Sequence, residues 1–234
     1  MKIQPTYILI HGSGLGGWCW DRVKDLMVSQ GANVYAPTFP STSETIEAYV
    51  AYIVDLIHRE DLRHCVLVGH SYGGMVVTGV ADRVRENVQR VIYLDAAVPN
   101  DGDDFASHIP NISKRQAKAR RSAFRALSQD GIWINPPAPQ LAGVSDPDDI
   151  DYVNKYADRF PLQTWLDPLR LARGGVGGLD KTYILAVNPR TDIMGYPQHG
   201  AIAKRSNDWR YREINCGHAA MIIDPKGVAA LLLE

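Results

Sequence analysis

The sequence predicts an α/β protein built on a mostly parallel central sheet that is flanked by helices. Two observations lead to this fold class: short, uniformly apolar runs recur along the chain, and longer stretches with helical spacing separate them. Runs of this kind are typical of parallel strands that are covered on both faces. Because strands and helices alternate, we expect them to form a single α/β sheet.

The apolar runs predict the strands in order. They occupy residues 7–10, 66–68, 91–94 and 183–187, and residues 211–214 are strand-like although they include Arg212 and Glu213. A helix is predicted over residues 43–59, where Ile46, Tyr49 and Val50 begin an apolar series at helical spacing. A second helix is predicted over residues 75–85.

The alternation breaks between residues 100 and 178. This stretch contains several prolines, two of them adjacent at Pro136 and Pro137, and a glycine-rich run at residues 174–178. Its position after the fourth or so strand puts it above the carboxyl ends of the strands, where open α/β sheets bind ligands. We therefore predict one domain over residues 1–234, with a helical cap or lid inserted at residues 100–178.

Composition and charge exclude several classes of protein. The chain is 45% hydrophobic and 22% charged, which is enough apolar material for a sizeable core. Its formal net charge of −1 leaves no strong field for nucleic acid or an anionic membrane. A basic run at residues 114–125 alternates with Ala and Ser, as on a solvated helix face. The expected partner is a small-molecule substrate, with no nucleic acid and no membrane, and a homodimer is left open.

Cysteine usage and the N-terminal residues indicate the compartment. Cys19, Cys65 and Cys216 are an odd number without C-x-x-C spacing, which argues against a disulfide framework and against a zinc cluster. The apolar run at residues 7–10 is too short for a signal peptide or a membrane span. We expect a cytoplasmic protein that uses no metal and no cofactor.

A serine stands at the centre of a predicted sharp turn. Residues 69–73 read GHSYG, a G-x-S-x-G motif between the strand at residues 66–68 and the helix at residues 75–85. The two glycines let strand and helix approach closely, which strains the backbone of Ser71 and exposes its hydroxyl at a helix N-terminus. This context predicts Ser71 as a nucleophile.

A second glycine-rich loop follows the first predicted strand and reads HGSGLGG at residues 11–17. We expect the backbone N–H groups of Ser13 and Tyr72 to form an oxyanion hole, which stabilises charge on a reacting carbonyl oxygen. The rival interpretation is a phosphate-binding loop. Neither G-x-x-x-x-G-K-[ST] nor a suitably spaced acidic residue accompanies these glycines, so the oxyanion hole is favoured.

His218 is the predicted general base. It follows the strand-like residues 211–214, and the order of serine before histidine is the one that a nucleophile on such a turn requires. His11 and His70 lie at the ends of predicted strands, where structural hydrogen bonding is the expected role. The prediction requires the Ser71 hydroxyl and the His218 imidazole to meet at the mouth of the sheet.

Two aspartates compete to orient this histidine. Asp95 ends the strand at residues 91–94, and a buried carboxylate at that position needs a polar partner such as a histidine N–H. Asp192 lies on the loop after residues 183–187, the usual place for such an acid, but four further residues delay it. We favour Asp95 and keep Asp192 as the alternative, while a helix cap or loop anchor would also account for Asp95.

These motifs together resemble a known family. HGSGLGGWCW at residues 11–20, GHSYGG at residues 69–74 and GH at residues 217–218 are similar to the plant methylesterase and hydroxynitrile lyase branch of the α/β-hydrolases, with its small bacterial esterase relatives. The resemblance is strongest over residues 5–99 and 205–234 and weak across the insertion. It implies the α/β-hydrolase fold, a triad on Ser71 and His218, oxyanion donors at Ser13 and Tyr72, a helical cap and no metal.

Departures from the family pattern narrow the expected activity. The lyases of this branch carry Thr after the first-loop His and Lys after the catalytic His, whereas this chain has Gly12 and Ala219. The plant members place their acid where this chain has Asn188 and Pro189, which again favours Asp95.

We therefore predict a serine esterase that cleaves a carboxylic ester or lactone of a small, apolar or aromatic substrate through an acyl-enzyme. Methyl esters, aryl esters, lactones and thioesters all remain open as substrates. The alternatives are a hydroxynitrile lyase-like or other cofactor-free lyase or proton-transfer enzyme on the same triad, and a non-catalytic binding protein on this scaffold.

Overall fold

A six-stranded parallel sheet forms the centre of the computed structural model, which describes residues 5–40, 44–189 and 194–234. The strand order is β2-β1-β3-β4-β7-β8, and every neighbouring pair is parallel. The strands are β1 (Thr6–Ile10), β2 (Asn33–Tyr35), β3 (Cys65–His70), β4 (Val88–Leu94), β7 (Asp180–Ala186) and β8 (Arg210–Ile214). The predicted fold class is thus confirmed.

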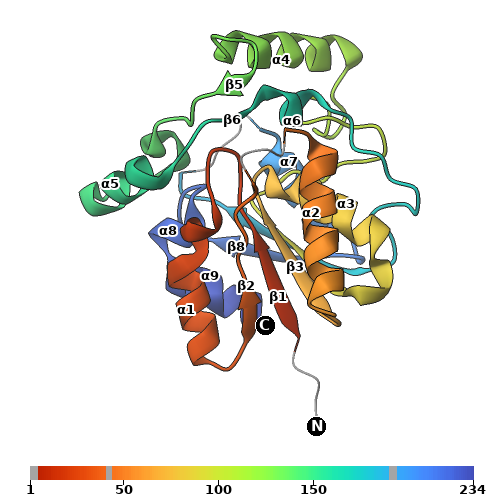
Figure 1. Ribbon diagram of the computed structural model, residues 1–234, viewed down its shortest axis with the longest axis vertical. Coiled ribbons are helices and arrows are strands. Elements are labelled where there is room, and N and C mark those ends of the chain that lie inside the picture. Colours follow the sequence, from red (N-terminus) through yellow and green to blue (C-terminus); the bar gives the residue numbers. More distant parts are fainter. Residues whose placement is uncertain (1–4, 41–43, 190–193) are drawn as a thin grey trace.

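Helices cover both faces of this sheet (Figure 1). One face packs against α1 (Asp21–Ser29), α8 (Ala220–Ile223) and α9 (Pro225–Leu233). The other face packs against α2 (Ile46–Arg59), α3 (Gly73–Arg83) and α7 (Tyr196–Arg205). Two apolar layers therefore enclose the strands, which explains why β1, β3 and most of β4 are apolar without alternation.

The start of α2 illustrates how local sequence sets an element. The Thr45 side chain accepts a hydrogen bond from the Ala48 N–H group (3.1 Å), which satisfies one of the free donors of the first turn. The apolar stripe of the helix is then buried against the sheet at Ile46, Tyr49, Val50, Ile53, Leu56 and Ile57. Strand β2 has no such signal, because it is only three residues long and its Asn33 is exposed. The sequence analysis did not predict it.

The residues between β4 and β7 form a separate set of helices and very short strands, the β4–β7 segment (residues 100–178). It contains α4 (Lys114–Leu127), β5 (Trp133–Ile134), α5 (Pro147–Tyr156), β6 (Phe160–Pro161) and α6 (Leu162–Leu166), with β5 and β6 paired antiparallel. Figure 1 shows α4, β5 and β6 above the end of the sheet that lies opposite the N-terminus. This end carries the carboxyl termini of the strands, where a ligand is expected to bind.

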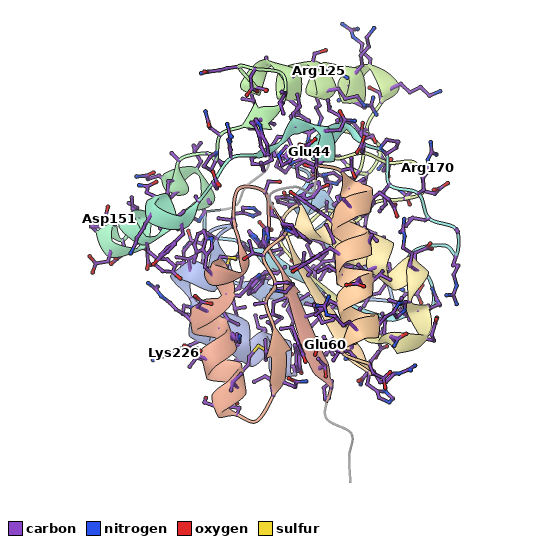
Figure 2. All side chains as sticks on the ribbon, in the orientation of Figure 1. Glu44, Glu60, Arg125, Asp151, Arg170 and Lys226 are labelled. Atoms are coloured by element: carbon purple, nitrogen blue, oxygen red, sulfur yellow. The ribbon has the colours of Figure 1, made fainter. Side chains whose placement is uncertain are left out.

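The basic run lies on α4, which begins with a capping box between Ser113 and Gln116. Ala117 and Phe124 are the buried residues of this helix, and Arg125 projects at the periphery of the molecule (Figure 2). Across the ranges that the structure describes, no helix is both long and apolar enough to cross a membrane.

Candidate active site

Ser71 occupies a strained turn between β3 and α3. Its φ angle is +56°, a left-handed conformation that costs a non-glycine residue ~1–3 kcal/mol. A Cβ atom added to Gly69 would lie 2.6 Å from the Gly73 carbonyl oxygen, so glycine is required for strand and helix to approach this closely. The Ser71 N–H donates to the Leu94 carbonyl (3.4 Å), which ties the turn to the end of β4.

Asp95 lies directly beyond β4 on the neighbouring strand end. It also has a positive φ angle, +44°, and only 1% of its surface is exposed. Its Oδ1 accepts a hydrogen bond from the Ala186 N–H group at 3.3 Å, and its Oδ2 lies 2.6 Å from His218 Nδ1. The buried carboxylate therefore has partners from the end of β7 and from the histidine.

His218 is held by one hydrogen bond to its ring and one to its backbone carbonyl. Because a carboxylate can only accept, His218 Nδ1 carries the proton that bonds to Asp95, and Nε2 remains available as an acceptor. The His70 Nε2–H group donates to the His218 carbonyl oxygen at 2.9 Å. The structure thus brings Asp95 and His218 together, while the alternative acid Asp192 lies outside the described residues.

The Ser71 hydroxyl differs from the expectation drawn from the sequence. Its Oγ lies 3.1 Å from the Tyr196 hydroxyl oxygen, and within the described residues no hydrogen bond joins Ser71 to His218. Both side chains nevertheless line the same cavity. Catalytic hydrogen bonds in free enzymes are often long or absent and tighten when substrate binds, so this resting geometry is compatible with a serine–histidine pair.

Tyr196 is the site residue that the sequence analysis missed. Its ring stacks on the His218 imidazole, with centroids 5.1 Å apart and planes inclined by 6°. It is the first residue of α7 and follows Gly195, whose φ angle is +77°. The only cue in the sequence is an aromatic residue between a glycine and Pro197 at the start of a helix, which has no established link to catalysis.

The loop after β1 packs directly against the nucleophile. A Cβ atom added to Gly12 would lie 2.9 Å from the Ser71 Cβ atom, so no side chain fits at that position without a shift. The N–H groups of Ser13 and Tyr72 take no part in the backbone hydrogen bonds of the described chain. These two amides therefore remain available to a ligand atom near Ser71.

A cavity of about 280 Å³ opens over Ser71 and His218. Its remaining walls are largely apolar and come mainly from the β4–β7 segment, among them Pro136, Leu141, Val153, Phe160 and Trp165. A substrate with an apolar body suits these walls, because hydrophobic lining with few polar groups favours apolar ligands.

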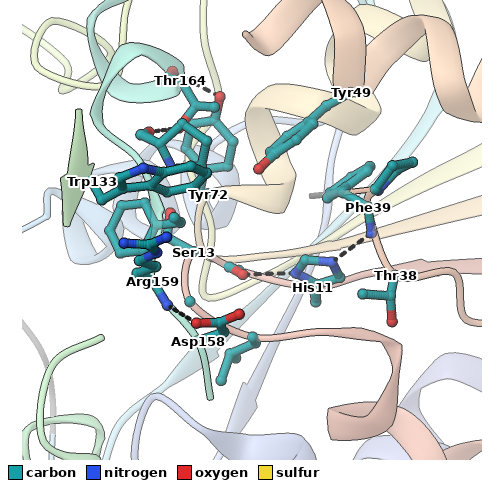
Figure 3. A pocket seen from close by; sticks show the side chains of 16 residues that line it. His11, Ser13, Thr38, Phe39, Tyr49, Tyr72, Trp133, Asp158, Arg159 and Thr164 are labelled. Carbon is teal, nitrogen blue, oxygen red and sulfur yellow. Dashed lines mark hydrogen bonds between the residues drawn. The ribbon is translucent and has the colours of Figure 1, made fainter. Parts of the chain in front are cut away.

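A larger cavity of about 590 Å³ shares part of its lining with the first (Figure 3). Gly12, Ser13 and Phe160 line both cavities, and the Trp165 Nε1–H group donates to Ser13 Oγ at their shared wall (2.7 Å). This second cavity has polar lining from Thr38, Tyr49, Asp158 and Arg159. The site therefore has a strongly apolar compartment at Ser71 and, beside it, a compartment of mixed polar and apolar lining.

The histidines beneath the site are buried and uncharged. Burial lowers the pKa of His11 to about 4, and burial together with the neighbouring His218 holds the pKa of His70 well below its usual range. His11 Nδ1–H donates to the Gly12 carbonyl oxygen (2.8 Å), a hydrogen bond of the structural kind expected from the sequence. The described part of the chain contains no group of three or more His, Cys, Asp or Glu side chains arranged to hold a metal ion.

A serine on a strained turn after β3 and a histidine after the last strand of a parallel sheet define a class of protein, the hydrolases with a nucleophile elbow. The chain belongs to the alpha/beta hydrolase family, whose model matches residues 7–231.

Two similar proteins are curated enzymes. One is the carbendazim hydrolyzing esterase of Nocardioides sp. (strain SG-4G), which is 31% identical over 98% of this chain and 98% of its own length. The other is Methylesterase 17 of Arabidopsis thaliana, which is 27% identical over 62% of this chain and 54% of its own.

A solved structure has the same fold. It is an extracellular alpha/beta-hydrolase from a Paenibacillus species, described as sharing structural and functional homology with tobacco Salicylic Acid Binding Protein 2. It superposes with a TM-score of 0.82 at 24% identity, covering 98% of each chain.

Proposed function

We propose that this carboxylic ester hydrolase works through an acyl-enzyme on Ser71, with His218 as the general base and Asp95 as the acid that orients it. The observation that carries the proposal is the 2.6 Å contact between His218 Nδ1 and Asp95 Oδ2 at the mouth of the cavity that Ser71 lines. A carboxylate in this position fixes the imidazole tautomer whose Nε2 accepts a proton.

The reaction then has two halves. In the first, His218 Nε2 takes the Ser71 proton while Oγ attacks the ester carbonyl, and the imidazolium returns the proton to the departing alcohol. In the second, His218 removes a proton from water, the water attacks the acyl group, and Ser71 recovers its proton as the acid leaves. The buried Asp95 stabilises the imidazolium of both halves through its bond to Nδ1.

The Ser13 and Tyr72 amides are assigned to the oxyanion. Each belongs to a segment that packs tightly against Ser71, and neither is used elsewhere in the backbone hydrogen bonding of the described chain. Fixed dipoles of this kind lower the barrier because they need no reorganisation when charge develops on the carbonyl oxygen.

The substrate assignment follows from the cavity walls. A small ester with an apolar or aromatic group suits the 280 Å³ cavity, and residues 100–178 are proposed as the cap that supplies most of its lining. The first compounds to test are short-chain aryl esters, methyl esters, lactones and carbendazim. Methyl esters and carbendazim are included because the similar proteins are a methylesterase and a carbendazim hydrolyzing esterase.

Cys19, Cys65 and Cys216 are all buried and free, which is consistent with a cytoplasmic location.

The lyase alternative receives less support from the geometry. The lyases that this chain resembles carry Thr at the position of Gly12, where a Cβ atom would lie within 2.9 Å of the Ser71 Cβ atom and 3.1 Å of His70 Nδ1. The close packing of this loop therefore leaves no space for the threonine. Ester hydrolysis requires no side chain at that position.

Replacement of Ser71 by alanine tests the proposal. We expect S71A to lose turnover of a chromogenic short-chain ester by roughly 10⁴- to 10⁶-fold, with an unchanged melting temperature. A fluorophosphonate probe should label the wild-type chain at Ser71 and leave S71A unlabelled, since labelling needs an activated nucleophile.

Ser29→Ala is the matched control, because Ser29 is exposed and its hydroxyl donates to the Leu26 carbonyl of its own helix. This variant should keep wild-type turnover and labelling. Unchanged ester turnover in S71A would overturn the serine mechanism, and turnover without labelling in the wild type would favour a proton-transfer enzyme.

A further inference from the structure

The environment of Tyr196 contains a contact that the triad does not explain. Its hydroxyl oxygen lies 3.1 Å from Ser71 Oγ, the atom that attacks the substrate in the proposed mechanism. The side chain is 1% exposed and lines the same cavity as Ser71 and His218. The phenol therefore touches the proposed reacting atom and is itself almost fully shielded from solvent.

The chain holds Tyr196 in this position through its backbone. Gly195 begins the helix with φ +77°, and a Cβ atom added there would lie 2.7 Å from Ile109 Cγ1, so glycine is needed for both conformation and packing. The single hydroxyl proton of Tyr183 is shared between two acceptors, the carbonyl oxygens of Ala96 (2.9 Å) and Tyr196 (3.1 Å). The two contacts of Tyr183 connect the start of α7 to the strand end that carries Asp95.

The direction of the Tyr196–Ser71 bond follows from the chemistry. For His218 Nε2 to receive the Ser71 proton, that proton must point to the imidazole, and the phenol must then be the donor to Oγ. An alkoxide oxygen can only accept, so this bond becomes charge-assisted as the proton leaves. Burial raises the pKa of the Tyr196 phenol above its ordinary range, which keeps its proton available throughout the pH range of a histidine base.

We propose that Tyr196 is a further catalytic residue of this hydrolase, whose hydroxyl donates a hydrogen bond to Ser71 Oγ and stabilises the negative charge that develops on that atom. The inference rests on the proposed function, because it assigns a partner to the same nucleophile. Charge develops on Oγ twice, when it attacks the ester and when it leaves the acyl group. Tyr196 keeps its own proton in both steps, while His218 takes and returns the proton of Ser71.

The ring of Tyr196 has a separate effect from its hydroxyl. It lies parallel to the His218 imidazole at 5.1 Å, and an aromatic face attracts the positive charge that forms when His218 is protonated. Phenylalanine preserves this stacking and removes only the donor. The substitution Tyr196→Phe is therefore a specific test of the hydroxyl.

The test compares Y196F with the wild type in three assays: steady-state turnover of a p-nitrophenyl ester, the rate of Ser71 labelling by a fluorophosphonate, and thermal melting. We expect kcat and the labelling rate to fall together by roughly 10- to 100-fold, which is the effect of losing one hydrogen bond to a charged oxygen. KM should stay within a factor of two or so, because the bond gains strength only in the transition state.

Tyr93→Phe is the matched control. Tyr93 is also fully buried, and its hydroxyl bonds to Thr78 Oγ1 at 2.7 Å inside the core rather than at the cavity. This variant loses a buried tyrosine hydroxyl in the same way and should keep the wild-type kcat and labelling rate. It therefore measures the cost to stability that any such loss brings.

Three results would overturn the inference. An unchanged kcat in Y196F means that the hydroxyl gives no stabilisation, and a raised kcat means that it holds Ser71 away from His218. A higher KM and a lower melting temperature with an intact labelling rate mean a structural role. Failure of the proposed function is recognised separately, because S71A would then retain turnover whatever Y196F does.

Discussion

The strand ends of the sheet and the β4–β7 segment meet at one cavity but are built in different ways. Ser71 and Asp95 both adopt strained left-handed conformations, and backbone hydrogen bonds to the neighbouring strands hold each of them in place. The β4–β7 segment consists of separate helices and two-residue strands joined by loops, with exposed apolar side chains that include Leu141 at 74% and Leu127 at 55%.

This difference suggests that the two regions would have separate tasks in the proposed mechanism. Strain at functional residues persists only where the surroundings fix it firmly, which the carboxyl ends of a buried parallel sheet do. Substrate fit requires only a wall of suitable shape, and short helices and loops supply that wall. Changes at the strand ends should therefore alter the chemical step, and changes in the segment should alter substrate binding.

The largest expected effect concerns the acid. In Asp95→Asn the side-chain oxygen can still accept from the Ala186 N–H group, but the amide NH₂ then faces His218 Nδ1 and forces the proton onto Nε2. The imidazole would be in the wrong tautomer to act as a base. We expect kcat to fall by roughly 10⁴-fold, measured with the chromogenic ester at pH 7.5.

Asp192→Asn is the comparison variant, because Asp192 was the alternative acid in the sequence analysis. It should change kcat by less than a factor of about three. A larger loss in the Asp192 variant than in the Asp95 variant would assign the triad acid to the loop after β7 instead.

The next effect is an acid-dependent loss of stability. Burial lowers the pKa of His11 and His199 to about 4 and holds the pKa of His70 and His108 well below the usual range. Between pH 6.5 and 4 the unfolded chain therefore binds more protons, so stability is complete above pH 6.5 and falls as the pH drops towards 4. His11 and His199 should each account for about 3 kcal/mol of this loss at pH 4.

Thermal melting at pH 7.5, 6.0 and 5.0 measures this dependence. His58→Gln should leave the dependence of melting temperature on pH unchanged, since His58 is exposed on α2. His11→Gln should make that dependence weaker. A melting temperature that stays constant down to pH 5.0 would show that these histidines are protonated in the folded protein.

The smallest effect concerns the cavity wall. Leu141→Ala removes an apolar side chain that lines the Ser71 cavity and is largely exposed. We expect KM for an apolar ester to rise roughly five-fold, from the loss of about 1 kcal/mol of apolar contact, with kcat and the melting temperature unchanged. Leu127→Ala on α4 is exposed to a similar extent but is absent from the cavity, and it should leave KM unchanged. Equal effects of the two substitutions would argue against the separation of tasks.

Most of the sheet was predictable because its strands are buried on both faces. The apolar runs at residues 7–10, 66–68, 91–94 and 183–187 lie within β1, β3, β4 and, apart from its last residue, β7. The three-residue strand β2 was missed, since it has one buried residue and no periodic pattern. The elements of the β4–β7 segment were not predictable individually, because strands of two residues such as β5 and β6 depend on each other's pairing.

The geometry of the candidate site was predictable where a motif fixes the backbone. Ser71 follows from glycines at fixed offsets, and Asp95 follows from a carboxylate at the end of a buried strand that needs a partner. Tyr196 was not predictable, because its contact with Ser71 joins residues 125 positions apart and depends on how α7 packs. The direction in which the Ser71 hydroxyl points was not predictable either, because it depends on the same tertiary contact.

The 2.6 Å bond between Asp95 and His218 has a consequence for engineering. Ser71 and Asp95, the proposed nucleophile and acid, precede residue 100, and His218, the proposed base, follows residue 178. All three proposed proton-transfer groups therefore lie outside residues 100–178. A chimaera that exchanges residues 100–178 for the corresponding cassette of another esterase would keep its proton-transfer groups intact. Variants with new substrate selectivity could then be sought by changing residues 100–178 alone.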